Sequence, residues 1–162
     1  MYRYIISISI AAFLLIGFAS CNRQQRDAVS LKVMSDEKAI RELTEAAETV
    51  NKACPIHTDN KTTLLAVSFR EHKWTYYYEV AEDSVVRFDN AVFNENIKAG
   101  LKASTRENLL ASHDMLTMLR ALIKVNADLV YSYKGKESGH SINVMFTYPE
   151  LRVMVDVMSA ER

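Results

Sequence analysis

The chain has 162 residues, of which 49% are hydrophobic and 25% are charged. These values are typical of one folded globular domain and exclude a largely disordered chain. The chain has 20 lysines and arginines and 20 aspartates and glutamates, so it carries no excess of positive charge. Its charge therefore does not predict binding to nucleic acid.

Residues 1–20 have the layout of a secretory signal peptide. Arg3 precedes an apolar run from Ile5 to Phe18, which is interrupted by two serines and one glycine. As a helix this run is roughly 21 Å long, shorter than the hydrocarbon core of about 30 Å. We therefore expect a cleaved signal peptide and an extracytoplasmic location.

The signal ends in Phe18-Ala19-Ser20-Cys21, which resembles the lipobox of bacterial lipoproteins. The resemblance implies cleavage before Cys21 and attachment of diacylglycerol, with acyl chains such as palmitate, to its thiol. The alternative is an ordinary cleaved signal in which Cys21 is an incidental thiol. Asn22 follows the cysteine, and in Gram-negative lipoproteins a residue other than aspartate there implies the outer rather than the inner membrane.

The polar stretch that begins at Cys21 has nothing to bury, so residues 21–34 are predicted to be a tether. Residues 35–162 are predicted to form a single domain.

The first element of this domain is a predicted helix over residues 36–53. Ser35 is a suitable N-cap, and apolar residues recur at spacings of three and four up to Cys54, where Pro55 prevents continuation. From residue 62 to 81 the apolar period changes to two, which predicts two antiparallel strands joined near residues 71–73. Residues 85–88 are a candidate short strand.

Residues 92–124 are predicted to be mostly helical, with a break near 103 or near His113-Asp114, and Ser104 to Glu107 fits a capping box. Alternation then predicts strands over residues 129–133 and 142–148, and a last strand over 151–155. This order, α-β-β-α-α-β-β-β, predicts an α+β fold in which two or three helices pack on one face of an antiparallel sheet of about five strands.

Cys54 and His57 are the candidate catalytic residues, because a nucleophilic cysteine needs a nearby base. Cys54 also completes the apolar stripe of a helix, which favours a buried structural thiol. The four histidines lack metal-site spacing, and no phosphate loop or cofactor motif is present, so we expect neither a metal nor a cofactor.

Trp74, Tyr76, Tyr77 and Tyr78 are the candidate binding residues, since exposed aromatic side chains can hold a sugar, a peptide or a protein. In a strand, however, Tyr77 must face away from Tyr76 and Tyr78, so we expect one of these sets to lie in the core.

The segment Val50-Asn-Lys-Ala-Cys-Pro55, the strand opened by Thr62 and the strand Thr75-Tyr-Tyr-Tyr78 resemble a group of small exported bacterial domains of unknown function. The resemblance covers residues 50–80 and implies an exported α+β domain without assigning an activity or ligand.

Together these features predict a membrane-anchored envelope lipoprotein that binds a protein or another envelope component without catalysing a reaction. Two alternatives stay open: an envelope enzyme that depends on Cys54 and His57, and a small-ligand-binding lipoprotein.

Overall fold

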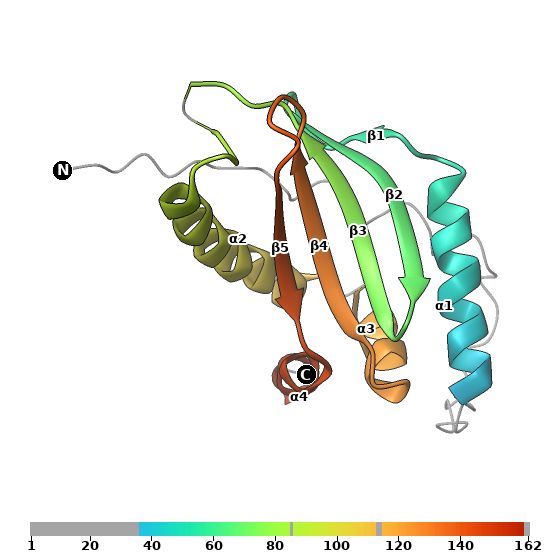
Figure 1. Ribbon diagram of the computed structural model, residues 1–162. Helices are drawn as coiled ribbons and strands as arrows, with labels where there is room; N and C mark the ends of the chain where they lie inside the picture. Colours follow the sequence, from blue (N-terminus) through green and yellow to red (C-terminus); the bar gives the residue numbers. More distant parts are fainter. Residues whose placement is uncertain (1–35, 85, 113–114, 161–162) are drawn as a thin grey trace.

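The computed structural model describes residues 36–84, 86–112 and 115–160, which contain four helices and a five-stranded sheet (Figure 1). The helices are α1 (Asp36–Asn51), α2 (Ala91–Ala111), α3 (Met115–Lys124) and α4 (Tyr148–Ala160). The strands are β1 (Ile56–His57), β2 (Thr62–Arg70), β3 (Lys73–Val80), β4 (Asp128–Gly135) and β5 (Ser141–Phe146). The predicted α+β class is confirmed, whereas the residues predicted to form a signal peptide and a tether, with Cys21, lie outside the described residues.

The strands lie side by side in chain order, from β1 to β5. Every neighbouring pair is antiparallel except β3 and β4, which are parallel. The expectation of a wholly antiparallel sheet is wrong at this pair. A hairpin turn cannot join parallel strands, because β4 must begin at the same end of the sheet as β3. Here α2 and α3 carry the chain from the end of β3 back to that end.

The hairpin between β2 and β3 turns where the sequence predicts it. Glu71 and His72 occupy the turn with φ values of 50° and 54°. Two central residues with positive φ are typical of the tight turn that matches the twist of the flanking strands. The His72 Nδ1 atom lies 2.7 Å from the carbonyl oxygen of Val125, which ties this turn to the end of α3.

The predicted break between the two middle helices is confirmed, because α2 ends at Ala111 and α3 begins at Met115. Two details differ from expectation. Ser104 lies inside α2, where its hydroxyl donates to the Leu101 carbonyl at 3.2 Å, so it does not cap a helix. Residues 86–88 form no strand, and Val85 lies outside the described residues.

The last segment is helix α4, so the strand expected over residues 151–155 is wrong. Leu151, Met154, Val155 and Met158 are its buried residues, and this spacing of three and four is helical. The helix starts with a capping box, in which the backbone N–H of Thr147 donates to Glu150 Oε2 at 2.8 Å.

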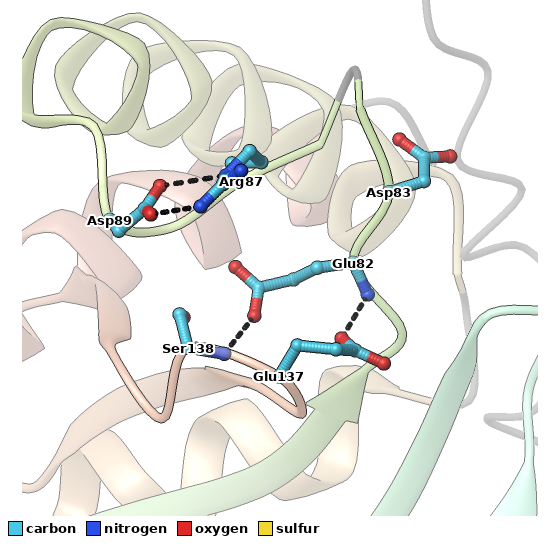
Figure 2. Close-up of a pocket in the computed structure, with 6 residues that line it drawn as sticks. All are labelled: Glu82, Asp83, Arg87, Asp89, Glu137 and Ser138. Carbon is cyan, nitrogen blue, oxygen red and sulfur yellow. Dashed lines mark hydrogen bonds and ion pairs between the residues drawn. The ribbon is translucent and has the colours of Figure 1, made fainter.

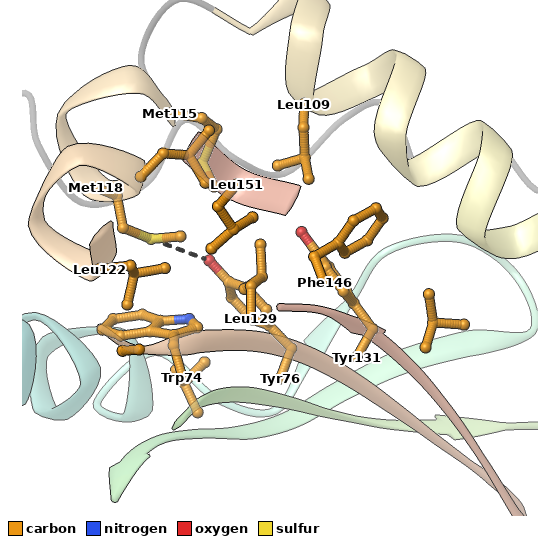
Figure 3. Close-up of a cluster of buried hydrophobic side chains, with 14 of the residues drawn as sticks. Trp74, Tyr76, Leu109, Met115, Met118, Leu122, Leu129, Tyr131, Phe146 and Leu151 are labelled. Atoms are coloured by element: carbon orange, nitrogen blue, oxygen red, sulfur yellow. Dashed lines mark hydrogen bonds between the residues drawn. The ribbon is translucent and has the colours of Figure 1, made fainter. Parts of the chain in front are cut away.

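The core lies between the sheet and the helical layer (Figure 3). Figure 3 shows Trp74 and Tyr76 of β3 beneath Met118 and Leu122 of α3, with Leu151 of α4 above the sheet. The strand residues that face this layer alternate along β3, β4 and β5, as expected for a sheet with one face buried. Among the described helices, none combines the length and apolar composition needed to cross a membrane.

Candidate interaction surface

The four aromatic candidates of β3 are divided between the two faces of the sheet. Trp74 and Tyr76 are 2% and 6% exposed, and Tyr78 is half-buried on the same side. The ring of Tyr76 stacks on Tyr131 with centroids 5.1 Å apart, and burial raises the pKa of Tyr76 to about 12. Tyr77 is 42% exposed and faces the other way. Of the four, Tyr77 is therefore the side chain that a partner can reach most fully.

The face opposite the helical layer, here called the outer sheet face, is mostly polar and partly exposed. Its residues belong to three neighbouring strands: Lys73, Thr75 and Tyr77 of β3, Val130 and Ser132 of β4, and Asn143 and Met145 of β5. Tyr77 and Met145 are each 42% exposed and are separated by β4. This face offers apolar side chains among hydroxyl and amide groups, a composition suited to holding a protein segment.

A groove of about 710 Å³ lies on the outer sheet face and reaches Lys98 and Lys102 of α2. Its lining residues include three lysines and no carboxylate. Lys102 Nζ lies 2.7 Å from Glu150 Oε1 and 5.3 Å from the centre of the Phe146 ring. Neither Lys73 nor Lys98 forms an ion pair within the described part of the chain. The groove therefore carries positive charge available to a ligand.

The groove residues of α2 and β5 were missed by the sequence analysis. Lys98 and Lys102 are four residues apart and share one side of α2. Asn143 and Met145 alternate along β5. The spacing was visible in the sequence, but the place where α2 meets β5 depends on a tertiary contact that no local pattern encodes.

Cys54 and His57 lie in the connection from α1 to β2. Cys54 is half-buried against the core, and burial raises the pKa of its thiol. The His57 Nδ1 atom lies 2.9 Å from the Thr63 hydroxyl, and no hydrogen bond joins His57 to Cys54. A raised thiol pKa lowers the fraction of nucleophilic thiolate at neutral pH.

A second pocket, of about 290 Å³, lies where the segment after β3 meets the turn between β4 and β5 (Figure 2). Glu82 and Glu137 connect the two segments reciprocally. Glu82 Oε2 accepts from the Ser138 backbone N–H at 2.6 Å, and Glu137 Oε2 accepts from the Glu82 N–H at 2.6 Å. This arrangement uses the carboxylates to hold loops together.

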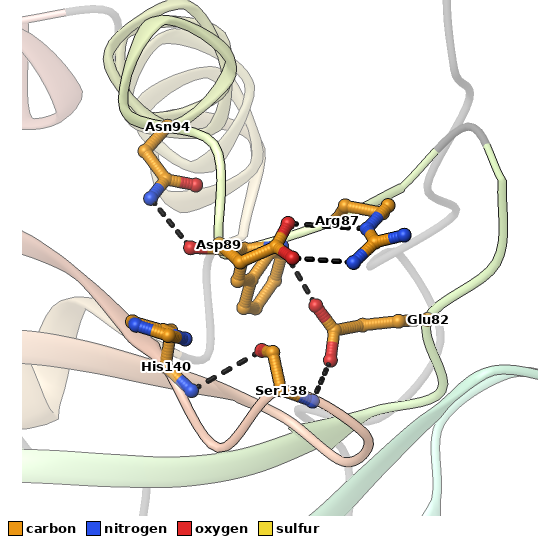
Figure 4. A network of polar contacts seen from close by, with 7 residues as sticks. Glu82, Arg87, Asp89, Asn94, Ser138 and His140 are labelled. Atoms are coloured by element: carbon orange, nitrogen blue, oxygen red, sulfur yellow. Dashed lines mark hydrogen bonds and ion pairs between the residues drawn. The ribbon is translucent and has the colours of Figure 1, made fainter.

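The wider polar network around Glu82 supports the same structural role (Figure 4). Desolvation raises the pKa of Glu82, but hydrogen bonds from Phe88 and Ser138 outweigh it and leave that pKa lowered. Arg87 pairs with Asp89 beside it. Nowhere in the described residues do three or more His, Cys, Asp or Glu side chains form a group that could hold a metal ion.

Comparison with known proteins bears on the fold and the family. A family model described as "Domain of unknown function (DUF8479)" matches residues 36–142. No curated protein sequence matches this chain.

Two solved structures share the fold. One is a protein from Pseudomonas aeruginosa assigned as secreted, with a TM-score of 0.53 and 15% identity, covering 77% of this chain and 100% of its own. The other is the pilotin EpsS from the type 2 secretion system of Vibrio vulnificus, with a TM-score of 0.53 and 9% identity, covering 72% of this chain and 94% of its own. At these identities the likeness concerns the fold.

Proposed function

The chain belongs to the DUF8479 family of domains of unknown function, and we propose that it is an exported, lipid-anchored domain that binds a protein of the cell envelope. The observation that carries this proposal is the groove on the outer sheet face. It joins exposed apolar side chains, Tyr77 and Met145, to lysines without bound carboxylates, Lys73 and Lys98. A surface with these properties recognises a partner without needing a catalytic group.

The location follows from the N-terminal sequence together with the shared fold. The apolar run that ends at Cys21 favours export and lipid attachment. The fold is shared with a protein assigned as secreted and with a pilotin of a secretion system, which supports a place outside the cytoplasm. Asn22 favours the outer membrane in a Gram-negative cell. The domain would then be held to the membrane through lipid on Cys21, and the protein partner would bind the folded domain.

The two alternatives differ in how far the site supports them. A cysteine-dependent enzyme would need an activated thiol at Cys54, whereas burial raises the pKa of this thiol and His57 is hydrogen-bonded to Thr63. A small ligand would have to be held in the groove, whose volume of about 710 Å³ is sufficient for one. The groove is partly open to solvent and spans three strands, which favours an extended protein segment.

The proposal is tested by comparing four tagged versions of the full chain in cells: wild type, Cys21→Ala, Tyr77→Asp and Val153→Asp. Val153 is 56% exposed on α4, outside the groove, and serves as the matched control for a charge placed at an exposed apolar position. After chemical cross-linking, each version is purified and its captured proteins are identified by mass spectrometry. Palmitate labelling and membrane fractionation of the same cells report lipid attachment.

We expect wild type and Val153→Asp to capture the same defined envelope protein, and Tyr77→Asp to lose it while remaining folded and membrane-bound. Cys21→Ala should lose palmitate labelling and leave the membrane fraction. Capture that survives Tyr77→Asp unchanged would contradict the role of the outer sheet face. Palmitate labelling that survives Cys21→Ala would contradict the proposed anchor.

A further inference from the structure

The strand β5 ends the sheet, with α2 packed nearby, and no further strand lies beside its outward edge in the described residues. The Gly135 N–H donates to the His140 carbonyl at 2.8 Å, which fixes the alternation of hydrogen bonds between β4 and β5. In an antiparallel pair this alternation turns the backbone of Ile142 and Val144 toward β4, and that of Asn143 and Met145 outward. Within the described residues, no hydrogen bond reaches the outward backbone groups of Asn143 or Met145.

The other end of the sheet is closed differently. The short strand β1 pairs with the first half of β2. Beyond it, the side chain of Asn51 bonds both the N–H and the carbonyl of Val67. An exposed strand edge is a ready site for pairing with another chain, and many proteins block it. Since this protein blocks β2 and leaves Asn143 and Met145 of β5 unpaired, β5 is the edge that a partner strand can extend.

The surroundings of β5 define the chemistry of such a strand. Its side chains would alternate between the two faces of the sheet. On the side of α2 they would meet Lys98, which is exposed and lines the groove one turn from Lys102, and Lys102 itself lies over the Phe146 ring. On the outer sheet face they would meet Met145, which is 42% exposed. Acidic residues of the partner strand would therefore suit the side of α2, and apolar residues would suit the outer sheet face.

Two occupants from the protein itself are disfavoured by charge. The tether, residues 21–34, carries Arg23, Arg26 and Lys32 against the single acid Asp27, so the lysines of the groove would repel it. A second copy that paired its own β5 edge here would bring another Lys98 to a groove whose lining residues include no carboxylate to balance it. A separate, acidic partner segment is left as the occupant that fits.

We propose that β5 and the groove beside it bind an extended segment of a partner protein, in which acidic and apolar residues alternate, as an additional strand of the sheet. This inference rests on the proposed function and names the chemistry of the partner. Main-chain hydrogen bonds to Asn143 and Met145 supply affinity, and Lys98 supplies specificity for carboxylates, since Lys102 is already paired with Glu150.

The probe is a fluorescent peptide in which valine and glutamate alternate, as long as β5, and a matched peptide with lysine in place of glutamate. Binding to the full chain, purified from membranes in a neutral detergent, is measured by fluorescence anisotropy at low and at moderate salt. The variants are Lys98→Glu and the control Lys52→Glu, whose lysine is exposed beyond the end of α1 and outside the groove. Hydrogen exchange reports the amides of Asn143 and Met145.

We expect the glutamate peptide to bind, with an affinity that falls as the salt concentration rises. Its binding should slow hydrogen exchange at the amides of Asn143 and Met145. Lys98→Glu should lower the affinity for the glutamate peptide by roughly tenfold and should bind the lysine peptide more tightly than the glutamate peptide. Lys52→Glu should bind both peptides as wild type does. The inference is overturned if the glutamate peptide does not bind, or if both peptides bind wild type equally. It also fails if Lys98→Glu causes self-association without changing peptide preference, because the lysines would then only guard the edge.

Failure of this inference differs from failure of the proposed function. If wild type captures an envelope protein that Tyr77→Asp loses, yet the glutamate peptide does not bind, the outer sheet face is the interaction surface and its partner has another chemistry. If the peptide binds β5 and no envelope protein depends on Tyr77, the proposed function is contradicted while the edge remains a peptide site.

Discussion

The side-chain amide of Asn51 forms two hydrogen bonds with the backbone of Val67. Asn51 Nδ2 donates to the Val67 carbonyl at 2.8 Å, and the Val67 N–H donates to Asn51 Oδ1 at 2.7 Å. The amide thus takes the place of a neighbouring strand at this point of the β2 edge. The Asn-Lys-x-Cys-Pro segment, which carries the resemblance to exported domains, has a structural role here, because its first residue covers the β2 edge at Val67.

Asn51→Ala is predicted to destabilise the fold by about 1–2 kcal/mol, because two hydrogen bonds of about 0.5–1.5 kcal/mol each are lost at a partly exposed site. Urea unfolding measures this change. Asn60→Ala, at an exposed position in the turn before β2, is the control and should unfold as wild type does. Equal stability of Asn51→Ala and Asn60→Ala would show that the β2 edge needs no cover.

The glycines of the chain offer a matched pair of substitutions. A Cβ at Gly135 would overlap the carboxylate of Glu82 and would lie 2.7 Å from the Ser138 hydroxyl, whereas a Cβ at Gly100 meets nothing within 4 Å. Gly135→Ala should therefore destabilise by about 1–2 kcal/mol, the scale of the hydrogen bonds that Glu82 must give up. Gly100→Ala, inside α2, should stabilise by about 0.5–1 kcal/mol.

Thermal or urea unfolding separates the two glycine substitutions. The cost of Gly135→Ala should shrink when Glu82 is also replaced by alanine, because the overlapping carboxylate is then absent. A cost that stays the same in the Glu82→Ala background would mean that the glycine is required for another reason.

Acid should weaken the contact between the loop after β3 and the turn before β5. The pKa of Glu82 is lowered in the folded protein by hydrogen bonds from Phe88 and Ser138, which outweigh desolvation. A lowered folded-state pKa stabilises the fold above the unfolded value of 4.5, and this contribution is lost as pH falls through the folded-state value. In Glu82→Gln, the free energy of unfolding should therefore fall less steeply than in wild type as the pH is lowered into the acid range.

The comparison for this acid effect is Glu48→Gln, on an exposed position of α1. It should leave the acid dependence of stability as in wild type, since its side chain holds no loop backbone. An acid dependence identical in Glu82→Gln and wild type would contradict the assignment of acid sensitivity to Glu82.

The Cys54 thiol is predicted to react slowly with thiol reagents in the folded protein. It is half-buried, and burial raises its pKa, so less thiolate is present at a given pH. Labelling should accelerate when denaturant unfolds the chain, and His57→Ala should leave the folded-state rate unchanged. A fast reaction of the folded protein that slows in His57→Ala would instead support the cysteine-dependent enzyme.

The sequence predicted most of the elements because their patterns are local. The stripe of Ala39, Leu43 and Ala47 is helical, and Trp74 and Tyr76 alternate in β3, so each element follows from its own period. The separation of Tyr77 from its aromatic neighbours likewise follows from the geometry of one strand.

The predictions of a last strand and of a wholly antiparallel sheet were wrong because another part of the chain determines the structure there. Val153 and Val155 alternate as in a strand, but Thr147 and Glu150 start a helix, and this capping box outweighed a short β-like run. The parallel pairing of β3 with β4 depends on the return path through α2 and α3. Lys98 and Lys102 could not be predicted as groove residues, because they line the groove only once α2 packs against β5.

The most direct test of the central claim places a photoactivatable amino acid at Met145 of the full chain in living cells, with Val153 as the matched position. Both side chains are apolar and exposed, at 42% and 56%. We expect illumination to cross-link Met145 of the outer sheet face to one defined envelope protein, with no such product from Val153. Equal products from both positions, or none from Met145 in folded, membrane-bound protein, would show that the outer sheet face is not the binding surface.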